Sequence, residues 1–138
     1  MTPLVIDAHQ DLAINILNAG RDYSRSAYET RERERREGRD LRGGETMLGW
    51  PEFQKAQVGL IFSTLFLGPY NPADPFTPKT PADARRMWRG MVECYERLAE
   101  EHPEQFQLVR NRGDLTRVLA PWDEKPADPL AQPAITHP

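Results

Sequence analysis

The sequence is poor in the residues from which many catalytic and redox sites are built. It has one cysteine and three histidines in 138 residues. A single cysteine, Cys94, excludes an intramolecular disulfide framework and is typical of a reducing compartment. No Gly-rich phosphate loop, no Cys-x-x-Cys pair and no Ser/His/Asp set is present. The common phosphate-binding, dithiol and serine-hydrolase sites are therefore excluded.

Long apolar runs and a strong charge of either sign are missing as well. No apolar stretch approaches the roughly 20 residues that span a bilayer. The N-terminus leads almost directly into a predicted strand, without the pattern of a signal peptide. The formal net charge is −3, so we expect neither a nucleic acid nor a membrane as the main partner. A cytoplasmic protein is expected.

What the sequence does contain is an alternation of strand and helix signals. Two runs, 4–7 and 58–67, are mostly apolar, as in strands that are buried on both faces of a parallel sheet. Helical spacing, caps and breakers predict helices at 11–19, 26–38, 50–56, 81–102 and 114–119. A further short strand is predicted at 106–109. This order predicts an α/β fold with parallel strands joined by right-handed crossovers.

The predicted strands are too few for a complete fold. Two parallel strands do not make a stable sheet, and a whole (β/α)₈ TIM-type barrel takes roughly 250 residues. We therefore expect residues 1–120 to be the first β/α units of such a barrel, incomplete in this chain. Residues 121–138 are expected to be a Pro-rich loop that stops before the next strand. The strand at 58–67 is then expected to lack neighbours within its own sequence.

The most informative motif is Val5-Ile6-Asp7-Ala8-His9-Gln10-Asp11-Leu12. Side chains alternate along a strand, so His9 and Asp11 are expected to point the same way, within several Å of each other. An imidazole nitrogen and a carboxylate are two ligands for a divalent metal. Asp7 is either an outer partner that orients a ligand or a strand-end cap, and both interpretations stay open. No other cluster completes the site, so no catalytic residue is assigned in this chain.

This segment resembles the first-strand signature of the renal (membrane) dipeptidases, a branch of the amidohydrolase superfamily. That signature is an apolar pair followed by Asp-x-His-x-Asp-Leu. Segment 49–62 resembles the next landmark of the family, a short helix that leads through a glycine into the second barrel strand. The amphipathic helix before Pro103-Glu104-Gln105-Phe106 also matches the layout, so the resemblance covers most of residues 4–119. Most amidohydrolases carry His-x-His here, and the His-x-Asp form favours the dipeptidase branch.

The resemblance implies hydrolysis of dipeptides by a metal-activated water at a binuclear Zn²⁺ site. His9 and Asp11 would be ligands of one metal. The bridging Glu, two further His and a late Asp of the family would belong to the missing C-terminal half of the barrel, so this chain is expected to be inactive alone. The implied partners are a dipeptide substrate and that missing half, and a homodimer stays open. Animal members also carry a secretion signal and a lipid anchor; neither is seen, which favours a bacterial-type cytoplasmic form.

Two rival interpretations are kept. The first is another amidohydrolase-type, metal-dependent amide or ester hydrolase, for which a downstream carboxylated lysine would replace the bridging Glu. The second is a non-catalytic truncated fragment or interaction module, which two metal ligands alone would fit. Other notable residues have structural explanations: Cys94 as a buried thiol, 31–37 as a solvated helix face, His102 as a solvated helix end and His137 as part of the tail.

Overall fold

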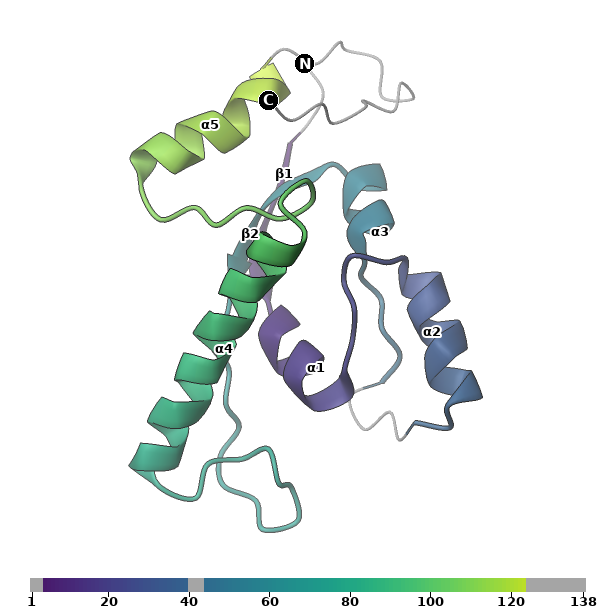
Figure 1. The fold of residues 1–138 in the computed structure, drawn as a ribbon, viewed down its shortest axis with the longest axis vertical. Helices are drawn as coiled ribbons and strands as arrows, with labels where there is room; N and C mark the ends of the chain where they lie inside the picture. The colour runs from purple at the N-terminus through teal and green to yellow at the C-terminus, as the bar shows by residue number, and fades with distance from the viewer. Residues whose placement is uncertain (1–3, 40–43, 124–138) are drawn as a thin grey trace.

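The computed structural model describes residues 4–39 and 44–123 of the chain (Figure 1). The elements, in chain order, are β1 (Val5–Gln10), α1 (Leu12–Ala19), α2 (Ala27–Arg36), α3 (Trp50–Lys55), β2 (Val58–Ser63), α4 (Pro81–Glu101) and α5 (Arg112–Asp123). The long helix α4 packs against α1, while α3 and α5 both contact β2. This order agrees with the predicted alternation of strands and helices.

The strands β1 and β2 form a two-stranded parallel sheet. Parallel strands need a long crossover connection, and here α1, α2 and α3 provide it. Val5 pairs with Val58 near one end of the sheet, and Gln10 pairs with Ser63 at the other. The prediction of parallel neighbours is confirmed. The C-terminal ends of both strands consequently lie at the same edge of the sheet.

The register of the sheet is irregular at two points, and Gly59 lies at one of them. Between Val5 and Ile6 the opposite strand advances by two residues, so Gly59 is an extra residue of β2. A Cβ atom at this position would lie 2.6 Å from the indole of Trp122 and closer still to the side chain of Leu4. Position 59 therefore requires glycine, because its neighbours occupy the space of a side chain.

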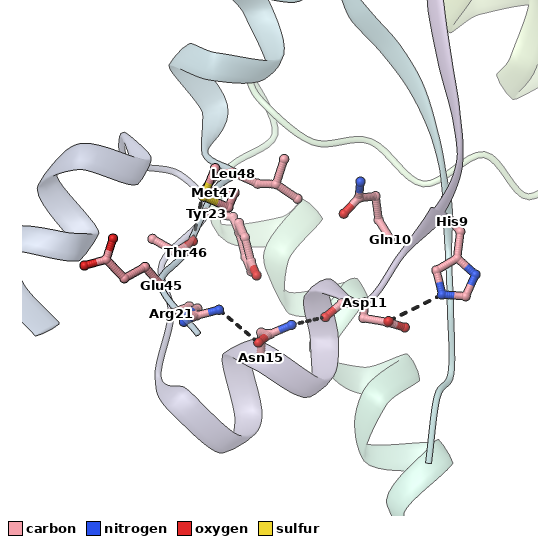
Figure 2. A pocket seen from close by; sticks show the side chains of 10 residues that line it. All are labelled: His9, Gln10, Asp11, Asn15, Arg21, Tyr23, Glu45, Thr46, Met47 and Leu48. Atoms are coloured by element: carbon pink, nitrogen blue, oxygen red, sulfur yellow. Dashed lines mark hydrogen bonds and ion pairs between the residues drawn. The ribbon is translucent and has the colours of Figure 1, made fainter. Parts of the chain in front are cut away.

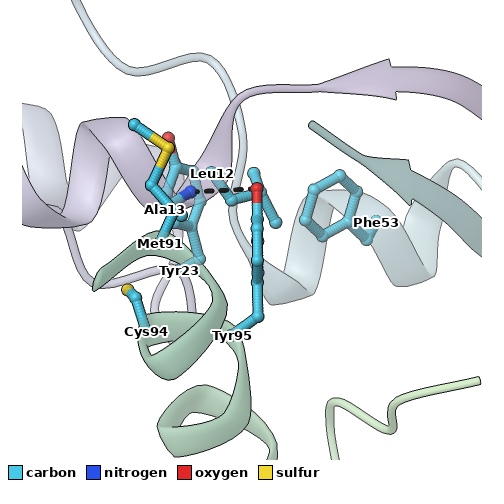
Figure 3. Close-up of a cluster of buried hydrophobic side chains, with 7 residues drawn as sticks. All are labelled: Leu12, Ala13, Tyr23, Phe53, Met91, Cys94 and Tyr95. Atoms are coloured by element: carbon cyan, nitrogen blue, oxygen red, sulfur yellow. Dashed lines mark hydrogen bonds between the residues drawn. The ribbon is translucent and has the colours of Figure 1, made fainter. Parts of the chain in front are cut away.

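The hydrophobic core lies between α1, α4 and the short helix α3 (Figure 3). Its buried members are Leu12, Ala13, Tyr23, Phe53, Met91, Cys94 and Tyr95. On α4 the buried positions Met91, Cys94 and Tyr95 follow the helical spacing that the sequence predicts. Cys94 is buried as predicted, and burial raises the pKa of its thiol. This thiol therefore serves packing, since the reactive thiolate is disfavoured.

The sheet and α4 also expose large apolar side chains. Ile6 is 53% exposed and Phe62 59%, while Trp88 and Val92 on α4 are each 43% exposed. The prediction of strands buried on both faces is therefore wrong within the described residues. In the same residues β2 has one neighbouring strand, β1, where the sequence predicted that it lacks neighbours. None of the described helices is long and apolar enough to cross a membrane.

Two predicted strand segments differ from the structure. β2 ends at Ser63 and not at residue 67, because the chain leaves β1 at Gln10 to form α1 and no described strand continues beside the later residues. Segment 106–109 is irregular where a strand was predicted. The ring of Phe106 instead packs edge-on against Trp50, with the ring centroids 5.6 Å apart. Packing against a helix thus replaces sheet pairing in this segment.

The C-terminal part of the described chain is more helical than predicted. α5 covers Arg112–Asp123, so it is longer than the predicted 114–119 and extends into the segment expected to be a loop. The rest of that segment, with His137, lies outside the described residues. His102 closes α4 as predicted but is half-buried and not fully solvated.

The start of α2 is tied to α3 by the carboxylate of Glu52. The Ser26 hydroxyl donates to Glu52 Oε1 (2.7 Å), and the backbone N–H of Ala27 donates to Oε2 (2.9 Å). Ser26 also caps the helix by accepting from the N–H of Tyr28 (3.1 Å). Burial by itself would raise the pKa of Glu52, but these hydrogen bonds outweigh it and lower the pKa. The ionised carboxylate is thus part of the helix cap.

We expect Glu52→Gln to lower the free energy of unfolding by about 1–2 kcal/mol at neutral pH, the usual effect of losing a helix cap. Because the folded-state pKa of Glu52 is lowered, its contribution is present above the unfolded pKa and is lost as the pH falls through the folded pKa. Urea unfolding at a series of pH values should show the difference from wild type shrinking on acidification. Glu104→Gln, an exposed control, should show no such difference. A pH-independent effect of Glu52→Gln would contradict this role.

Candidate metal centre

His9 and Asp11 lie together at the C-terminal end of β1 (Figure 2). The imidazole Nε2 of His9 is 3.4 Å from Oδ2 of Asp11. The His9 side chain is 66% exposed and that of Asp11 34%, so both can be reached from solvent. The prediction that the two side chains lie within several Å of each other, at this edge of the sheet, is confirmed.

The reason for this proximity differs from the predicted alternation along one strand. Asp11 is not a strand residue: it is the N-cap of α1, with φ −94° and ψ 48°. The pairing of β1 with β2 is also irregular between Asp7 and Gln10. Asp7 pairs with Ile61 and Gln10 with Ser63, so β1 advances by three residues while β2 advances by two. Such bulges are frequent next to functional sites, where they re-aim a side chain. The bulge and the strand-to-helix turn together bring His9 and Asp11 to one side.

The distance between the two groups is long for a direct hydrogen bond, and it is also compatible with two ligands of one metal ion. Two ligand atoms about 2.0–2.1 Å from a tetrahedral zinc ion are about 3.3–3.4 Å apart. A good N–H···O hydrogen bond is shorter, with a usual limit of about 3.2 Å. Within residues 4–39 and 44–123, no group of three or more His, Cys, Asp or Glu side chains could hold a metal. His9 and Asp11 are therefore two candidate ligands without a third beside them in this part of the chain.

Asp11 is held from several directions. Its Oδ1 accepts a short hydrogen bond from the hydroxyl of Thr64, the residue that follows β2. Its backbone carbonyl accepts from the side-chain amide of Asn15 on α1 (2.8 Å). The oxygen Oδ2 is the one that faces His9. Sequence patterns did not reveal Thr64 as part of the site, because the contact depends on the pairing of β1 with β2.

Asp7 contacts the backbone and not the ring of His9. Its Oδ1 accepts from the backbone N–H of His9 (3.0 Å), and its Oδ2 accepts from the side-chain amide of Gln10. The hydrogen bond from Gln10, followed by the one from His9, lowers the pKa of Asp7. Asp7 lies inside β1 and not at the strand end that the cap interpretation assumed, and its hydrogen bond to His9 is to the backbone and not to the ring. The carboxylate of Asp7 thus stabilises the irregular backbone of β1 at His9.

A cavity of about 250 Å³ adjoins the two candidate ligands (Figure 2). His9, Asp11 and Asn15 line it from the end of β1 and the start of α1. Tyr23 and segment 45–48 line it from the other side, with both polar and apolar side chains. A small molecule bound there would lie beside His9 and Asp11.

Arg21, which lines the cavity, forms a buried ion pair that the sequence did not predict. Arg21 Nε donates to Glu34 Oε1 (2.9 Å), and the two side chains are only 7% and 0% exposed. Arg21 also donates to Asn15 Oδ1 (3.1 Å) and to the carbonyl of Gly44. Its planar fork therefore joins α1, α2 and the segment beside the cavity. Hydrogen bonds therefore connect Arg21 to the side chain of Asn15, and Asn15 to the backbone carbonyl of Asp11.

The prediction that 31–37 forms a uniformly solvated helix face is wrong for Glu34. The exposed pair Glu32 and Arg35 behaves as expected, with 2.7 Å between the charged groups. Glu34, in contrast, shares the buried face of α2 with Ala27 and Thr30. The spacing of three and four between these residues is a helical pattern that could have indicated the buried position. A charged residue among so many other charges masked it.

Loss of the buried partner should be costly. We expect Glu34→Ala to lower the free energy of unfolding by about 3–5 kcal/mol, because Arg21 is left buried without its counter-charge. Glu32→Ala, a control on the same helix with an exposed partner, should cost about 0.5 kcal/mol or less. The double variant Arg21→Met/Glu34→Leu should recover much of the loss, since it buries no charge. Equal effects of the two single variants in urea unfolding would contradict this account.

Comparison with known proteins adds no independent assignment. The chain matches no protein-family model, no curated protein and no solved structure. A function is therefore inferred from the geometry of His9 and Asp11, from the parallel sheet beside them and from the resemblance of the motif around them.

Proposed function

We propose that this chain forms the first β/α units of a (β/α)₈ metallohydrolase similar to the renal dipeptidases, with His9 and Asp11 as ligands of a zinc ion. One observation carries the proposal. His9 Nε2 and Asp11 Oδ2 are 3.4 Å apart at the C-terminal edge of a parallel sheet. Barrels of this class place their chemistry at that edge. The reaction proposed is hydrolysis of the amide bond of a dipeptide.

A bound zinc ion supplies an activated water and polarises the substrate carbonyl. The residues of this chain that would hold the ion are His9, through its imidazole, and Asp11, through its carboxylate. Thr64 occupies Oδ1 of Asp11, which leaves Oδ2 directed toward His9. The adjoining cavity of about 250 Å³ suits a substrate of small size.

The exposed apolar surface also supports a larger barrel. In a (β/α)₈ barrel each strand has a neighbour on either side and helices cover the outside. Side chains such as Ile6 and Phe62, which are more than half exposed here, would be covered by further β/α units. We propose that those units supply a bridging Glu and two His for a binuclear site. The partners of this chain are then the rest of the barrel and a dipeptide, in the cytoplasm.

Two observations are also compatible with the rival functions. The His9 and Asp11 pair would serve equally in an amidohydrolase that cleaves another amide or an ester, and the identity of the remaining ligands distinguishes the two. A non-catalytic fragment is favoured by the small number of ligands, because the described residues offer two where zinc sites use three or four.

Zinc binding tests the proposal directly. We expect the 138-residue chain to bind Zn²⁺ weakly and with saturation, seen as shifts of the His9 ring signals in an NMR titration. His9→Ala and Asp11→Asn should each weaken binding at least tenfold, because each removes one of two ligands. His102→Ala, at the end of α4, should leave the titration unchanged. Zinc binding that survives His9→Ala would contradict the proposal.

Activity should depend on more than this chain. We expect the purified 138 residues to hydrolyse no dipeptide in the presence of Zn²⁺, because two protein ligands do not build a binuclear site. A longer product of the same gene that includes the remaining ligands should hydrolyse dipeptides and lose most of that activity on His9→Ala. Release of free amino acids, followed by chromatography, measures both. Hydrolysis by the 138 residues alone would show that the assignment is wrong.

A further inference from the structure

The hydroxyl of Tyr95 joins three elements beside the candidate metal centre. It comes from α4, and its side chain is 8% exposed. It accepts from the backbone N–H of Ala13 at the start of α1 (3.2 Å; Figure 3) and donates to the carbonyl of Thr64 (3.0 Å). The carbonyl of Gln10 is more distant, at 3.5 Å. A phenol has one proton, so Thr64 is its better acceptor.

Thr64 is thereby fixed by both of its backbone polar groups. Its N–H donates to the carbonyl of Gln10 (3.0 Å), and its own carbonyl accepts from Tyr95. Its hydroxyl lies within reach of two acceptors, Asp11 Oδ1 and the Gln10 carbonyl (3.1 Å). The single hydroxyl proton is directed to Asp11, because a charged acceptor forms the stronger hydrogen bond.

This arrangement gives the two oxygens of Asp11 different roles. Oδ1 is occupied by Thr64, and Oδ2 faces His9 Nε2 at 3.4 Å. Without the contact to Thr64, the carboxylate plane could rotate, since the terminal torsion of aspartate has broad energy wells. Partners of this kind orient metal-binding carboxylates and affect metal affinity.

We propose that Thr64 and Tyr95 are a positioning pair that fixes the carboxylate of Asp11 for metal binding. The inference rests on the proposed metal-binding role of Asp11. Tyr95 acts at one remove, by holding the backbone of Thr64, and Thr64 acts on the carboxylate itself. Neither side chain contacts the metal in this arrangement, so their effect is on the orientation of a ligand.

Conservative variants of the whole chain test the pair. Thr64→Val removes the hydroxyl with little change in shape, Thr64→Ser keeps it, and Tyr95→Phe removes only the phenol oxygen. We expect Zn²⁺ affinity to fall about 10- to 100-fold for Thr64→Val, to stay near wild type for Thr64→Ser and to fall less for Tyr95→Phe than for Thr64→Val. Thermal unfolding of each variant shows whether the fold is retained.

A second readout needs no metal. In crystal structures of the metal-free protein, the carboxylate plane of Asp11 should be rotated in Thr64→Val and unchanged in Thr64→Ser. Unchanged Asp11 orientation in Thr64→Val, or unchanged Zn²⁺ affinity in that variant while His9→Ala abolishes binding, would overturn the positioning role alone. Zinc binding that is unaffected by His9→Ala would overturn the proposed function and this inference with it.

Discussion

The parallel pairing of β1 with β2 is the constraint on which the rest of the structure depends. It requires a crossover, which α1, α2 and α3 provide, and it places the C-terminal ends of both strands at one edge. Asp11 follows one strand and Thr64 follows the other, so the hydrogen bond between them exists only because of this pairing. The candidate metal centre is thus a product of sheet topology as well as of a local motif.

Near that edge of the sheet lies a set of polar side chains that are joined by hydrogen bonds and include a buried ion pair. Arg21 and Glu34 are both almost fully buried, and Arg21 is linked through Asn15 to the backbone of Asp11. Burying two charges has a large desolvation cost, so such a pair is weak grounds for extra stability. Its value here is geometric: Arg21 joins α1, α2 and the segment beside the cavity through bonds of fixed direction.

The described residues also expose an apolar surface to solvent. The side chains of Ile6 and Phe62 on the sheet, and of Trp88 and Val92 on α4, are exposed although their composition is that of a protein interior. Surfaces of this kind mark a place where further structure packs. The proposal of a larger barrel accounts for these side chains and for the incomplete ligand set with one cause.

Much of the secondary structure, and the choice of His9 and Asp11 as candidate ligands, could be predicted from the sequence. The helix between Thr80 and His102 and the two strand segments follow short-range patterns of capping and hydrophobic spacing, whereas the pairing of the strands joins residues far apart in the chain. Likewise, His9 and Asp11 are two residues apart, so the sequence identifies them as a candidate pair, although their orientation depends on the irregular pairing of β1 with β2.

The features that the sequence did not predict depend on contacts between residues far apart in the chain. β2 stops at Ser63 because β1 offers no further partner, which no property of residues 64–67 indicates. Glu34 is buried where Arg21, 13 residues earlier in the sequence, forms an ion pair with it. The position of Asp11 is set by a bulge and by Thr64, 53 residues away. Local preference is encoded residue by residue, whereas partners across a fold are decided by the packing of the whole chain.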